Sequence, residues 1–222
     1  MAGTLVPLVL DIEGTTSSTA FVYDTLYPYS RARLAGWVAA HPDDEWVRVA
    51  AEAGGGDAVG ALTRWMDADE KVTALKAIQG RIWDEGFAAG ELVSHFYPDA
   101  VPAVRRWHGE GRALYVFSSG SVTAQQAWFG HSPDGDLRDL VDGWFDTETA
   151  GPKKEPESYR RIAAVVGATP VFLSDVTAEL DAARAAGWAT IGVRRPGDRW
   201  YGAGVGGHPE VGSFSEVDAL LA

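Results

Sequence analysis

Two carboxylates and a glycine occur close together near the start of the chain, in the stretch LVLDIEGTT at residues 8–16. The apolar run before Asp11 predicts a short buried strand, and Gly14 permits a tight turn after it. On an extended backbone, Asp11 and Glu13 would point the same way because they are two residues apart. Such a pair repels itself unless a hard cation binds it, so we expect one Mg²⁺ ion here. Alternatively, Asp11 only starts a turn and Glu13 is solvated.

Small hydroxyl residues follow a second predicted strand, in the tetrapeptide Ser118-Ser119-Gly120-Ser121. They stand at the start of a predicted helix, where backbone N–H groups and hydroxyls can bind a phosphate. The alternative is an ordinary serine helix cap with a polar turn.

Two lysines, Lys153 and Lys154, follow Gly151-Pro152 and precede another predicted helix. A lysine at this position can offset the charge on a transferring phosphoryl group as a compact point charge. The alternative is a solvated loop with two surface lysines.

A second acidic pair, Asp175 and Glu179, follows the predicted strand at residues 171–173. One helical turn separates the two residues, so both can face the same cavity. Asp175 is then a third oxygen ligand for the cation, and Glu179 a direct or water-bridged ligand. Alternatively, Asp175 caps the helix that begins near Thr177.

The elements around these four motifs alternate along the chain. Apolar runs predict strands at 113–117, 144–146, 171–173 and 189–193, and helical spacing predicts helices at 100–108, 121–129, 157–166 and 177–186. This alternation predicts an α/β fold with a doubly wound parallel sheet and helices on both faces. Ligands of such sheets bind beyond the carboxyl ends of the strands, which is where all four motifs stand.

A helical segment interrupts the alternation after the first strand. Residues 21–90 have helical spacing, Gly54-Gly55-Gly56 divides them into a front and a rear pair of helices, and Asp43 or Asp44 is a plausible cap at a further joint. We therefore predict a catalytic α/β core of residues 1–18 and 99–222, with a helical cap inserted at residues 19–98.

Composition narrows the class of protein. The chain has 222 residues, 46% of them hydrophobic, and a formal net charge of −12. The charge argues against nucleic acid and acidic membrane surfaces as partners, and no apolar run approaches the ~20 residues that cross a bilayer. Without cysteine, disulfides and thiolate sites are excluded. We expect a cytoplasmic monomer that acts on a small phosphorylated metabolite.

Together the motifs resemble the haloacid dehalogenase superfamily, and within it most closely the acireductone synthase family, the enolase-phosphatases of methionine salvage. Glu13 is the most telling feature, because most phosphatases of the superfamily carry Asp there. After residue 193 only Arg195-Pro196-Gly197 matches. The resemblance covers nearly the whole chain and rests on DIEGTT (11–16), TALKAIQG (73–80), FSSGSVTAQQAWFGHS (117–132), VDGWFDT (141–147), KKEPESYRRIA (153–163) and FLSDVTAE (172–179).

The resemblance implies a magnesium site built from both acidic motifs. Asp11 would be the nucleophile and a magnesium ligand, and Glu13 would bind the metal and serve as acid and base. Asp175 would complete the magnesium site. Glu179 stands in the second place of its motif, which implies a position next to the metal ligands rather than certain direct contact with the ion.

It also implies a phosphate site. Ser118 and Ser119 would bind the phosphate of the substrate, and Lys153 would hold phosphoryl oxygen and nucleophile in register. The family position falls on Lys153, with Lys154 as the alternative.

The family substrate is 2,3-diketo-5-methylthiopentyl-1-phosphate, which is enolised and then dephosphorylated to the acireductone 1,2-dihydroxy-3-keto-5-methylthiopentene. Glu13 is one hypothesis for the enolisation base, because of its reach. Phe21, Tyr23 and tryptophans of the insert are candidates to line the methylthio end of the substrate.

Two alternatives compete with this function. One is a generic small-metabolite phosphatase or a dehalogenase of the same superfamily; a dehalogenase needs no metal, which Asp175 and Glu179 argue against. The other is a phospho-accepting signalling receiver. Receivers carry their acceptor aspartate on a middle strand and have no large helical insert after the first strand, which disfavours that class.

Overall fold

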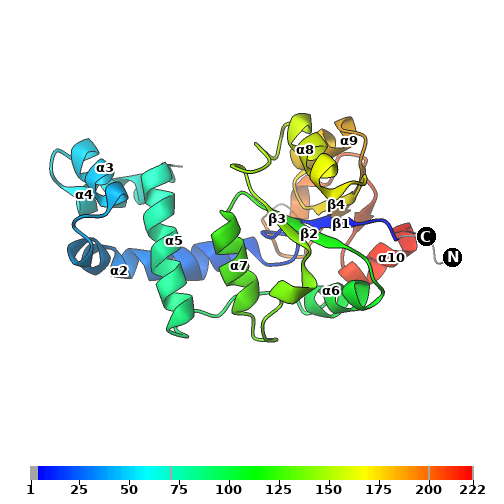
Figure 1. The fold of residues 1–222 in the computed structure, drawn as a ribbon, viewed down its shortest axis with the longest axis horizontal. Coiled ribbons are helices and arrows are strands. Elements are labelled where there is room, and N and C mark those ends of the chain that lie inside the picture. The colour runs from blue at the N-terminus through cyan, green and yellow to red at the C-terminus, as the bar shows by residue number, and fades with distance from the viewer. Residues whose placement is uncertain (1–4, 71, 200, 222) are drawn as a thin grey trace. The chain divides into compact units, whose positions relative to one another are not determined.

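The computed structural model describes residues 5–70, 72–199 and 201–221. The chain forms two compact units (Figure 1). The core unit consists of the chain up to Ala20 together with the chain from Ser94 onward, and the helical unit is Phe21–Val93. The predicted boundaries after residues 18 and 98 lie within a few residues of these limits. The division into a catalytic core and a cap stays a prediction.

The core unit is built on a parallel sheet, which in the described residues has the strand order β3-β2-β1-β4-β5-β6. All neighbouring strands are parallel, as the alternating sequence pattern predicts. Strand order reverses at β1, so the doubly wound α/β fold is confirmed. The strands are β1 (Leu8–Leu10), β2 (Leu114–Phe117), β3 (Gly143–Phe145), β4 (Val171–Ser174), β5 (Ala189–Val193) and β6 (Glu210–Val211).

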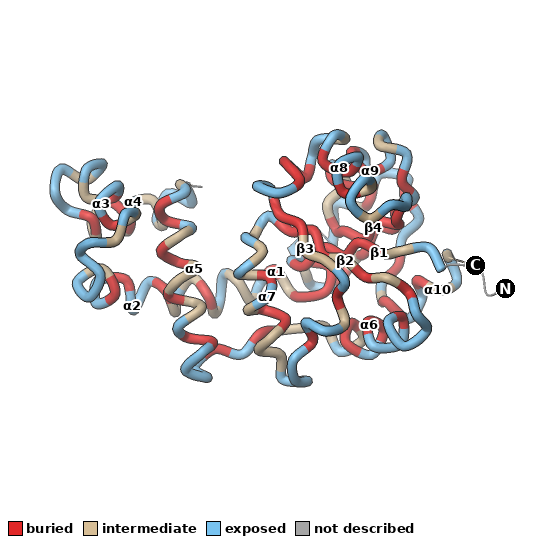
Figure 2. Tube along the Cα trace, in the orientation of Figure 1, coloured by how far each residue is buried: buried red, intermediate tan, exposed pale blue. Residues whose placement is uncertain are grey.

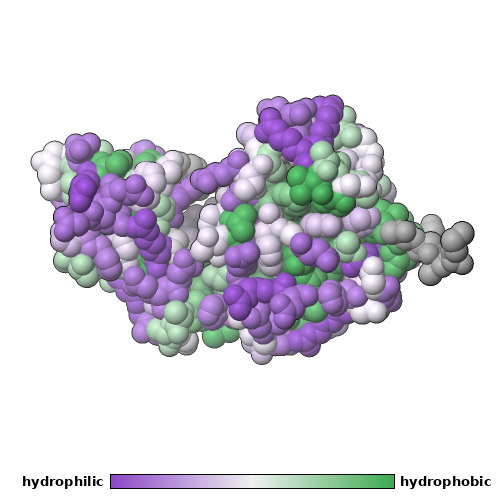
Figure 3. Space-filling model, in the orientation of Figure 1, coloured by the Kyte–Doolittle hydropathy of each residue, from purple (hydrophilic) through white to green (hydrophobic). Residues whose placement is uncertain are grey.

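Helices cover both faces of this sheet (Figure 1). Helix α6 (Ala100–Gly109), the short turn η4 (Phe214–Glu216) and α10 (Val217–Leu221) lie on one face, and α8 (Pro156–Val166) and α9 (Thr177–Ala185) on the other. Figure 3 shows hydrophilic side chains over α8 and α9, as expected for amphipathic surface helices. The remaining elements of the core unit are α7 (Val122–Gly130) and the turns η2 (Arg138–Leu140) and η3 (Tyr201–Ala203).

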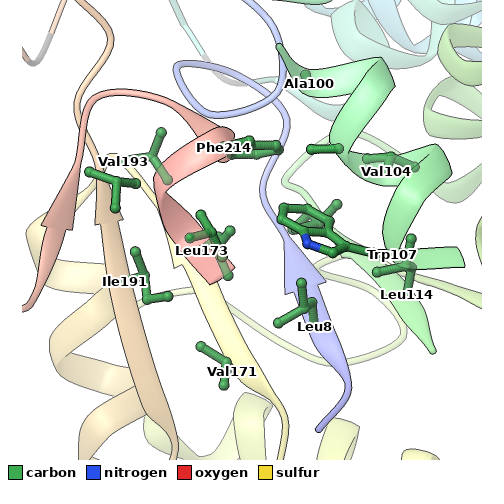
Figure 4. Packing of buried hydrophobic residues seen from close by; sticks show 14 residues of the cluster. Leu8, Ala100, Val104, Trp107, Leu114, Val171, Leu173, Ile191, Val193 and Phe214 are labelled. Carbon is green, nitrogen blue, oxygen red and sulfur yellow. The ribbon is translucent and has the colours of Figure 1, made fainter. Parts of the chain in front are cut away.

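Successive residues of β1 point into two separate hydrophobic cores. Leu8 and Leu10 pack with Trp107 and Phe214 on the α6 face, as Figure 4 shows for Leu8 and its neighbours. Val9 packs on the opposite face with the residues of α8 and α9. Strand β1 is therefore buried on both sides (Figure 2), which explains its unbroken apolar sequence and fixes the position of the residues that follow it.

The register of the sheet brings three of the predicted motifs to neighbouring strand ends. Leu10 of β1 pairs with Val116 of β2 on one side and with Leu173 of β4 on the other. The backbone N–H of Asp11 donates to the carbonyl of Leu173 at 3.0 Å. The segments that begin at Asp11, Ser118 and Asp175 therefore leave the same edge of the sheet.

The helical unit follows β1 in the chain, as predicted. Asp44 caps α3 by accepting the backbone N–H of Trp46 at 2.8 Å, and Gly54-Gly55-Gly56 separates α3 from α4. The unit has its own hydrophobic core, with Leu34, Trp37 and Ile78 among its members. Its elements are α1 (Thr19–Phe21, at the boundary), the π-helix η1 (Val22–Leu26), α2 (Tyr27–Ala40), α3 (Glu45–Ala53), α4 (Ala58–Asp67) and α5 (Thr73–Ala88).

The structure departs from the sequence prediction at a few places. Strand β1 ends at Leu10 and the chain turns at Ile12, so Asp11 and Glu13 do not lie on an extended strand. The two-residue strand β6 and the π-helix η1 are not predicted, because neither has a periodic pattern of its own. In the part of the chain that the structure describes, no helix is long and apolar enough to cross a membrane.

Candidate active site

A buried lysine joins two of the predicted acidic residues at the carboxyl edge of the sheet. The Nζ atom of Lys153 lies 2.5 Å from Oδ1 of Asp11 and 2.6 Å from Oε2 of Glu179. All three residues are buried, whereas Lys154 is exposed. The structure thus brings Lys153, and not Lys154, to Asp11, and Lys153 does not lie in a solvated loop.

The loop that carries Lys153 is fixed by the first turns of α8. The hydroxyl of Tyr159, which is fully buried, donates to the carbonyl of Lys153 at 2.7 Å, and Ser158 Oγ donates to the carbonyl of Pro152 at 2.7 Å. Gly151 has a φ of +104°, and a Cβ there would lie 2.8 Å from Ser158 Oγ. Glycine is therefore required at this turn, and the lysine reaches the site on a rigid backbone.

The segment after β1 is tightly wound around one carbonyl. The backbone N–H groups of Thr15, Thr16 and Ser17 all donate to the carbonyl of Ile12, at 3.2, 3.0 and 2.9 Å. The hydroxyl of Thr15 donates to Oδ2 of Asp11 at 3.4 Å. We refer to residues 11–17 as the Asp11 loop; its threonines hold the backbone and one carboxylate oxygen of the residue that begins it.

Asp175 lies directly against Gly14 of this loop. Gly14 has a φ of +77°, and a Cβ there would lie 2.1 Å from Oδ2 of Asp175. Ser174 Oγ, rather than the side chain of Asp175, accepts the backbone N–H of Val176 at the start of α9. The helix-cap alternative for Asp175 is therefore wrong, and its buried Oδ1 has no hydrogen-bond partner in the described residues.

Burial shifts the pKa values of these groups strongly. It raises the pKa of Asp11 to about 7, with Glu179 and Glu13 adding to the rise and Lys153 opposing it. Burial and the charges of Asp11 and Glu179 raise the pKa of Asp175 to about 8. For Lys153 burial alone would lower the pKa, but Asp11 and Glu179 outweigh it and raise the pKa. The site thus holds more negative charge than one lysine balances.

The carboxylate oxygens of Asp11, Glu13 and Asp175 are the kind of ligand that a hard divalent cation prefers. As they stand, no three Asp, Glu, His or Cys side chains among the described residues are grouped closely enough to hold a metal ion. Lys153 contacts the carboxylates of both Asp11 and Glu179. However, the buried Oδ1 of Asp175 has no hydrogen-bond partner in the described residues, and burial raises the pKa of both aspartates, so the site offers acidic oxygen atoms whose charged form a cation would stabilise. A cation bound beside Asp11 and Asp175 would lower both pKa values.

Glu13 is the exposed residue of the Asp11 loop. It forms an isolated parallel bridge with Ser17, and its charge contributes to the raised pKa of Asp11. Since Glu13 is exposed while Asp11 is buried, the two carboxylates have different environments. Such a difference suits separate roles for the two residues in acid–base chemistry.

The hydroxyl motif follows β2 at the same edge. The hydroxyl oxygen of Ser118 accepts the backbone N–H of Gly120 at 3.2 Å, and Ser121 caps α7 by accepting the N–H of Ala124. The cap is therefore Ser121, and Ser118 and Ser119 are not cap residues. Ser118 is buried and Ser119 is exposed.

Two buried residues hold the segment 118–121, which we call the hydroxyl loop. The sequence motifs predicted no role for either residue. The side-chain amide of Gln125 donates to the carbonyls of Gly120 and Phe145, both at 2.8 Å. Asp146 Oδ2 accepts the backbone N–H of Val122 at 2.9 Å. Both residues lie in segments that carry the family resemblance, and this was the only sign in the sequence that they matter. Neither a glutamine nor an aspartate indicates by its type alone that it binds a loop.

In the helical unit, Tyr23 lines a cavity of about 240 Å³ with Tyr27, Trp65 and Met66. Charged side chains, among them Arg31, Glu70 and Lys76, line the same cavity, so it is not a purely apolar pocket. The contact of Tyr23 with a substrate stays a prediction.

The fold and the site together define a class of hydrolase. A parallel sheet with an aspartate after its first strand, a helical insertion after that strand and a lysine paired with the aspartate occur here in one chain. The family model of the haloacid dehalogenase-like hydrolases matches residues 7–187. The class predicted from the motifs is thereby confirmed.

Comparison with known proteins identifies the family within this class. An enolase-phosphatase E1 of Streptomyces avermitilis is 56% identical over 95% of this chain and 93% of its own length, and that of Frankia alni is 57% identical over 94% and 93%. The crystal structure of the UTR4 protein of Saccharomyces cerevisiae has a TM-score of 0.80 and 30% identity, covering 95% of this chain and 99% of that one. The chain belongs to the enolase-phosphatase E1 family of haloacid dehalogenase-like hydrolases.

Proposed function

We propose that this protein is a magnesium-dependent enolase-phosphatase that acts on 2,3-diketo-5-methylthiopentyl-1-phosphate in methionine salvage. The observation that carries the phosphatase part is the buried contact between Lys153 and Asp11 beside Asp175. Membership of the enolase-phosphatase E1 family supports the specific substrate.

In the proposed phosphoryl transfer, a carboxylate oxygen of Asp11 attacks phosphorus. The new bond joins this oxygen to phosphorus, the bond from phosphorus to the substrate oxygen breaks, and Glu13 donates a proton to that leaving oxygen. Water then attacks phosphorus, Glu13 takes a proton from the water, and the bond between Asp11 and phosphorus breaks. The products are inorganic phosphate and the regenerated Asp11 carboxylate.

Asp11, Glu13 and Asp175 would hold the Mg²⁺ ion. When bound, the ion would neutralise charge on the carboxylates and on the phosphoryl oxygens. Glu179 contacts Lys153 through its Oε2 atom, so we propose that it orients the lysine and stays outside the inner ligand set.

The phosphate would be held by Lys153 and by the hydroxyl loop. Lys153 already contacts the nucleophile, so its ammonium can stabilise a phosphoryl oxygen next to Asp11. Ser118 and Ser119 offer hydroxyls and backbone N–H groups at the end of β2. The rigid support that Tyr159 and Gln125 give these loops would position the phosphate for in-line attack.

Enolisation requires removal of a proton next to a carbonyl of the diketone. We propose Glu13 as the base because it is the exposed carboxylate of the site. Glu13→Gln should slow accumulation of the enol-phosphate; accumulation at the native rate would show that another group is the base.

The test is to incubate purified protein and Mg²⁺ with the diketo-phosphate, following ultraviolet absorbance of the enol products and free phosphate together. Both signals should appear. Phosphate without enol absorbance would leave the generic phosphatase, and a persistent phosphoprotein without turnover would favour the signalling receiver. The monomeric state, the cytoplasmic location and the 19–98 insert boundaries remain predictions.

A further inference from the structure

A turn near the C-terminal end of the chain contacts the Asp11 loop from outside the catalytic motifs. It comprises residues 195–198, one residue beyond the end of β5, and is closed by the backbone N–H of Asp198 donating to the carbonyl of Arg195 at 3.0 Å. The sequence Arg195-Pro196-Gly197 is part of the family resemblance, but nothing in the proposed mechanism uses it.

Arg195 is buried, with 3% of its surface exposed, and its guanidinium makes three kinds of contact. Its Nε donates to the carbonyl of Thr15 at 2.9 Å, and its Nη1 donates to Oδ2 of Asp99 at 2.7 Å. The guanidinium also lies over the rings of Tyr97 and Phe214, at 4.4 and 4.7 Å from their centroids. These contacts fix the side chain in one orientation.

Thr15 connects this arginine to the proposed nucleophile. Its carbonyl binds Arg195, and its hydroxyl donates to Oδ2 of Asp11 at 3.4 Å. A backbone shift at Thr15 would therefore move a group that contacts the carboxylate of Asp11. Such a shift also changes the turn at Gly14, which lies directly against Asp175.

Asp198, at the other end of the turn, binds the backbone that follows the Asp11 loop. Its Oδ2 accepts the backbone N–H of Thr19 at 3.0 Å and the hydroxyl of Tyr97. The backbone N–H of Tyr97 in turn donates to the carbonyl of Thr16 at 2.9 Å. The 195–198 turn thus forms hydrogen bonds to both ends of the segment 15–19, to Thr15 through Arg195 and to Thr19 through Asp198.

From these contacts we infer that Arg195 is a positioning residue that sets the Asp11 loop for Mg²⁺ binding and phosphoryl transfer. It does so through the Thr15 carbonyl, while Asp99 supplies its counter-charge. Groups that orient metal ligands from outside typically contribute about 10–100-fold to metal affinity. This inference rests on the proposed function, because it assumes that the Asp11 loop binds the cation.

The test compares Arg195→Met with Arg194→Met. Arg194 is the adjacent arginine, and it contacts Glu210 and Tyr201 rather than the Asp11 loop. We expect Arg195→Met to weaken Mg²⁺ binding, measured calorimetrically well below the melting temperature, by about 10–100-fold. Amide hydrogen exchange of residues 15–19 should become at least about tenfold faster. Arg194→Met should leave both quantities within about twofold of the native protein.

Arg195→Lys is the second variant, in case Arg195→Met does not fold. It keeps the positive charge, but an ammonium cannot reproduce the forked contact with Thr15 and Asp99, so it should show the same two changes at smaller size. Unchanged Mg²⁺ affinity and unchanged exchange at residues 15–19 in either folded variant would overturn the inference, even if the melting temperature fell. The exchange measurement needs neither substrate nor metal, so a native protein that fails to turn over the diketo-phosphate would refute the proposed function without deciding the role of Arg195.

Discussion

Lys153 Nζ lies 2.5 Å from Asp11 Oδ1, although the two residues are 142 positions apart in the sequence. The contact is buried and is shared with Glu179. A lysine held so close to a carboxylate can stabilise added negative charge on a phosphoryl group that the carboxylate accepts. This pair therefore supports Lys153 as the charge partner of the transferred phosphoryl group.

Replacing Lys153 should abolish most phosphatase activity, and replacing Lys154 should not. We expect Lys153→Met to lower kcat for phosphate release by roughly 10²–10³-fold, as removal of a transition-state charge partner usually does. Lys154→Met is the matched control, because Lys154 is exposed. Steady-state phosphate release from both variants tests this, and equal losses would contradict the assignment of Lys153.

Gly14→Ala should disrupt the proposed metal site. The added Cβ would lie 2.1 Å from Oδ2 of Asp175, at a φ of +77° that alanine rarely adopts. We expect at least about tenfold weaker Mg²⁺ binding and a loss of about 1–3 kcal/mol of stability. Calorimetric titration with Mg²⁺ and chemical unfolding measure the two effects.

Gly36→Ala is the control for this substitution. Gly36 lies in α2 with open space around it, so alanine there should stabilise the protein by about 0.5–1 kcal/mol. If Gly14→Ala bound Mg²⁺ as tightly as the native protein, the contact between Asp175 and Gly14 would not be needed for metal binding, and the prediction would be wrong.

Gln125→Leu should loosen the hydroxyl loop. The variant loses two donated hydrogen bonds of 2.8 Å and leaves the carbonyls of Gly120 and Phe145 without them. We expect about 2 kcal/mol lower stability and a higher KM for the phosphorylated substrate. Gln126→Leu, at an exposed neighbouring position, should change neither quantity. An unchanged KM in a destabilised Gln125→Leu would limit this residue to a structural role.

The stability of the metal-free protein should fall as the pH rises from about 4 to 8. Folding raises the pKa of Asp11 from 3.8 to about 7 and that of Asp175 from 3.8 to about 8, so the folded state keeps protons that the unfolded state releases in this range. The stability is fully present below the unfolded pKa and is lost as the pH rises through the folded values. We expect the melting temperature to drop by at least about 5 °C across this window, and a smaller drop in Asp175→Asn.

Mg²⁺ affinity should have the opposite pH dependence. The ion must displace the protons that Asp11 and Asp175 hold, so the apparent affinity should rise between pH 6 and about 8 and then level off. Titration calorimetry at several pH values measures this rise, together with the protons released on binding. An affinity that does not change over this range would contradict raised pKa values at the site.

Much of the fold follows from local sequence patterns. Helix α3 begins where Asp44 predicts a cap, and Gly54-Gly55-Gly56 separates two helices as expected. The alternation of apolar strands and helices after residue 99 predicts the parallel sheet. The π-helix at Val22–Leu26 and the two-residue strand β6 were not predictable, because tertiary contacts rather than periodicity define them.

The sequence predicted which strand ends carry the site residues. It did not predict the contacts among their side chains. Spacing placed Glu179 one turn from Asp175, yet its carboxylate contacts Lys153 and accepts a hydrogen bond from Ser174 Oγ. Gln125 and Arg195 were not given roles, since an amide or a guanidinium that binds backbone carbonyls leaves no characteristic spacing. Long-range side-chain contacts of this kind require the folded chain.

The most direct test of the central claim is to find where the phosphoryl group goes during turnover. The native protein is mixed with Mg²⁺ and the diketo-phosphate, quenched in acid within a single turnover, digested and analysed by mass spectrometry. We predict a phosphoryl group on the peptide that contains Asp11, and neither this adduct nor released phosphate in Asp11→Asn. Phosphate release by the native protein with no adduct at any time, or full activity in Asp11→Asn, would contradict Asp11 as the nucleophile.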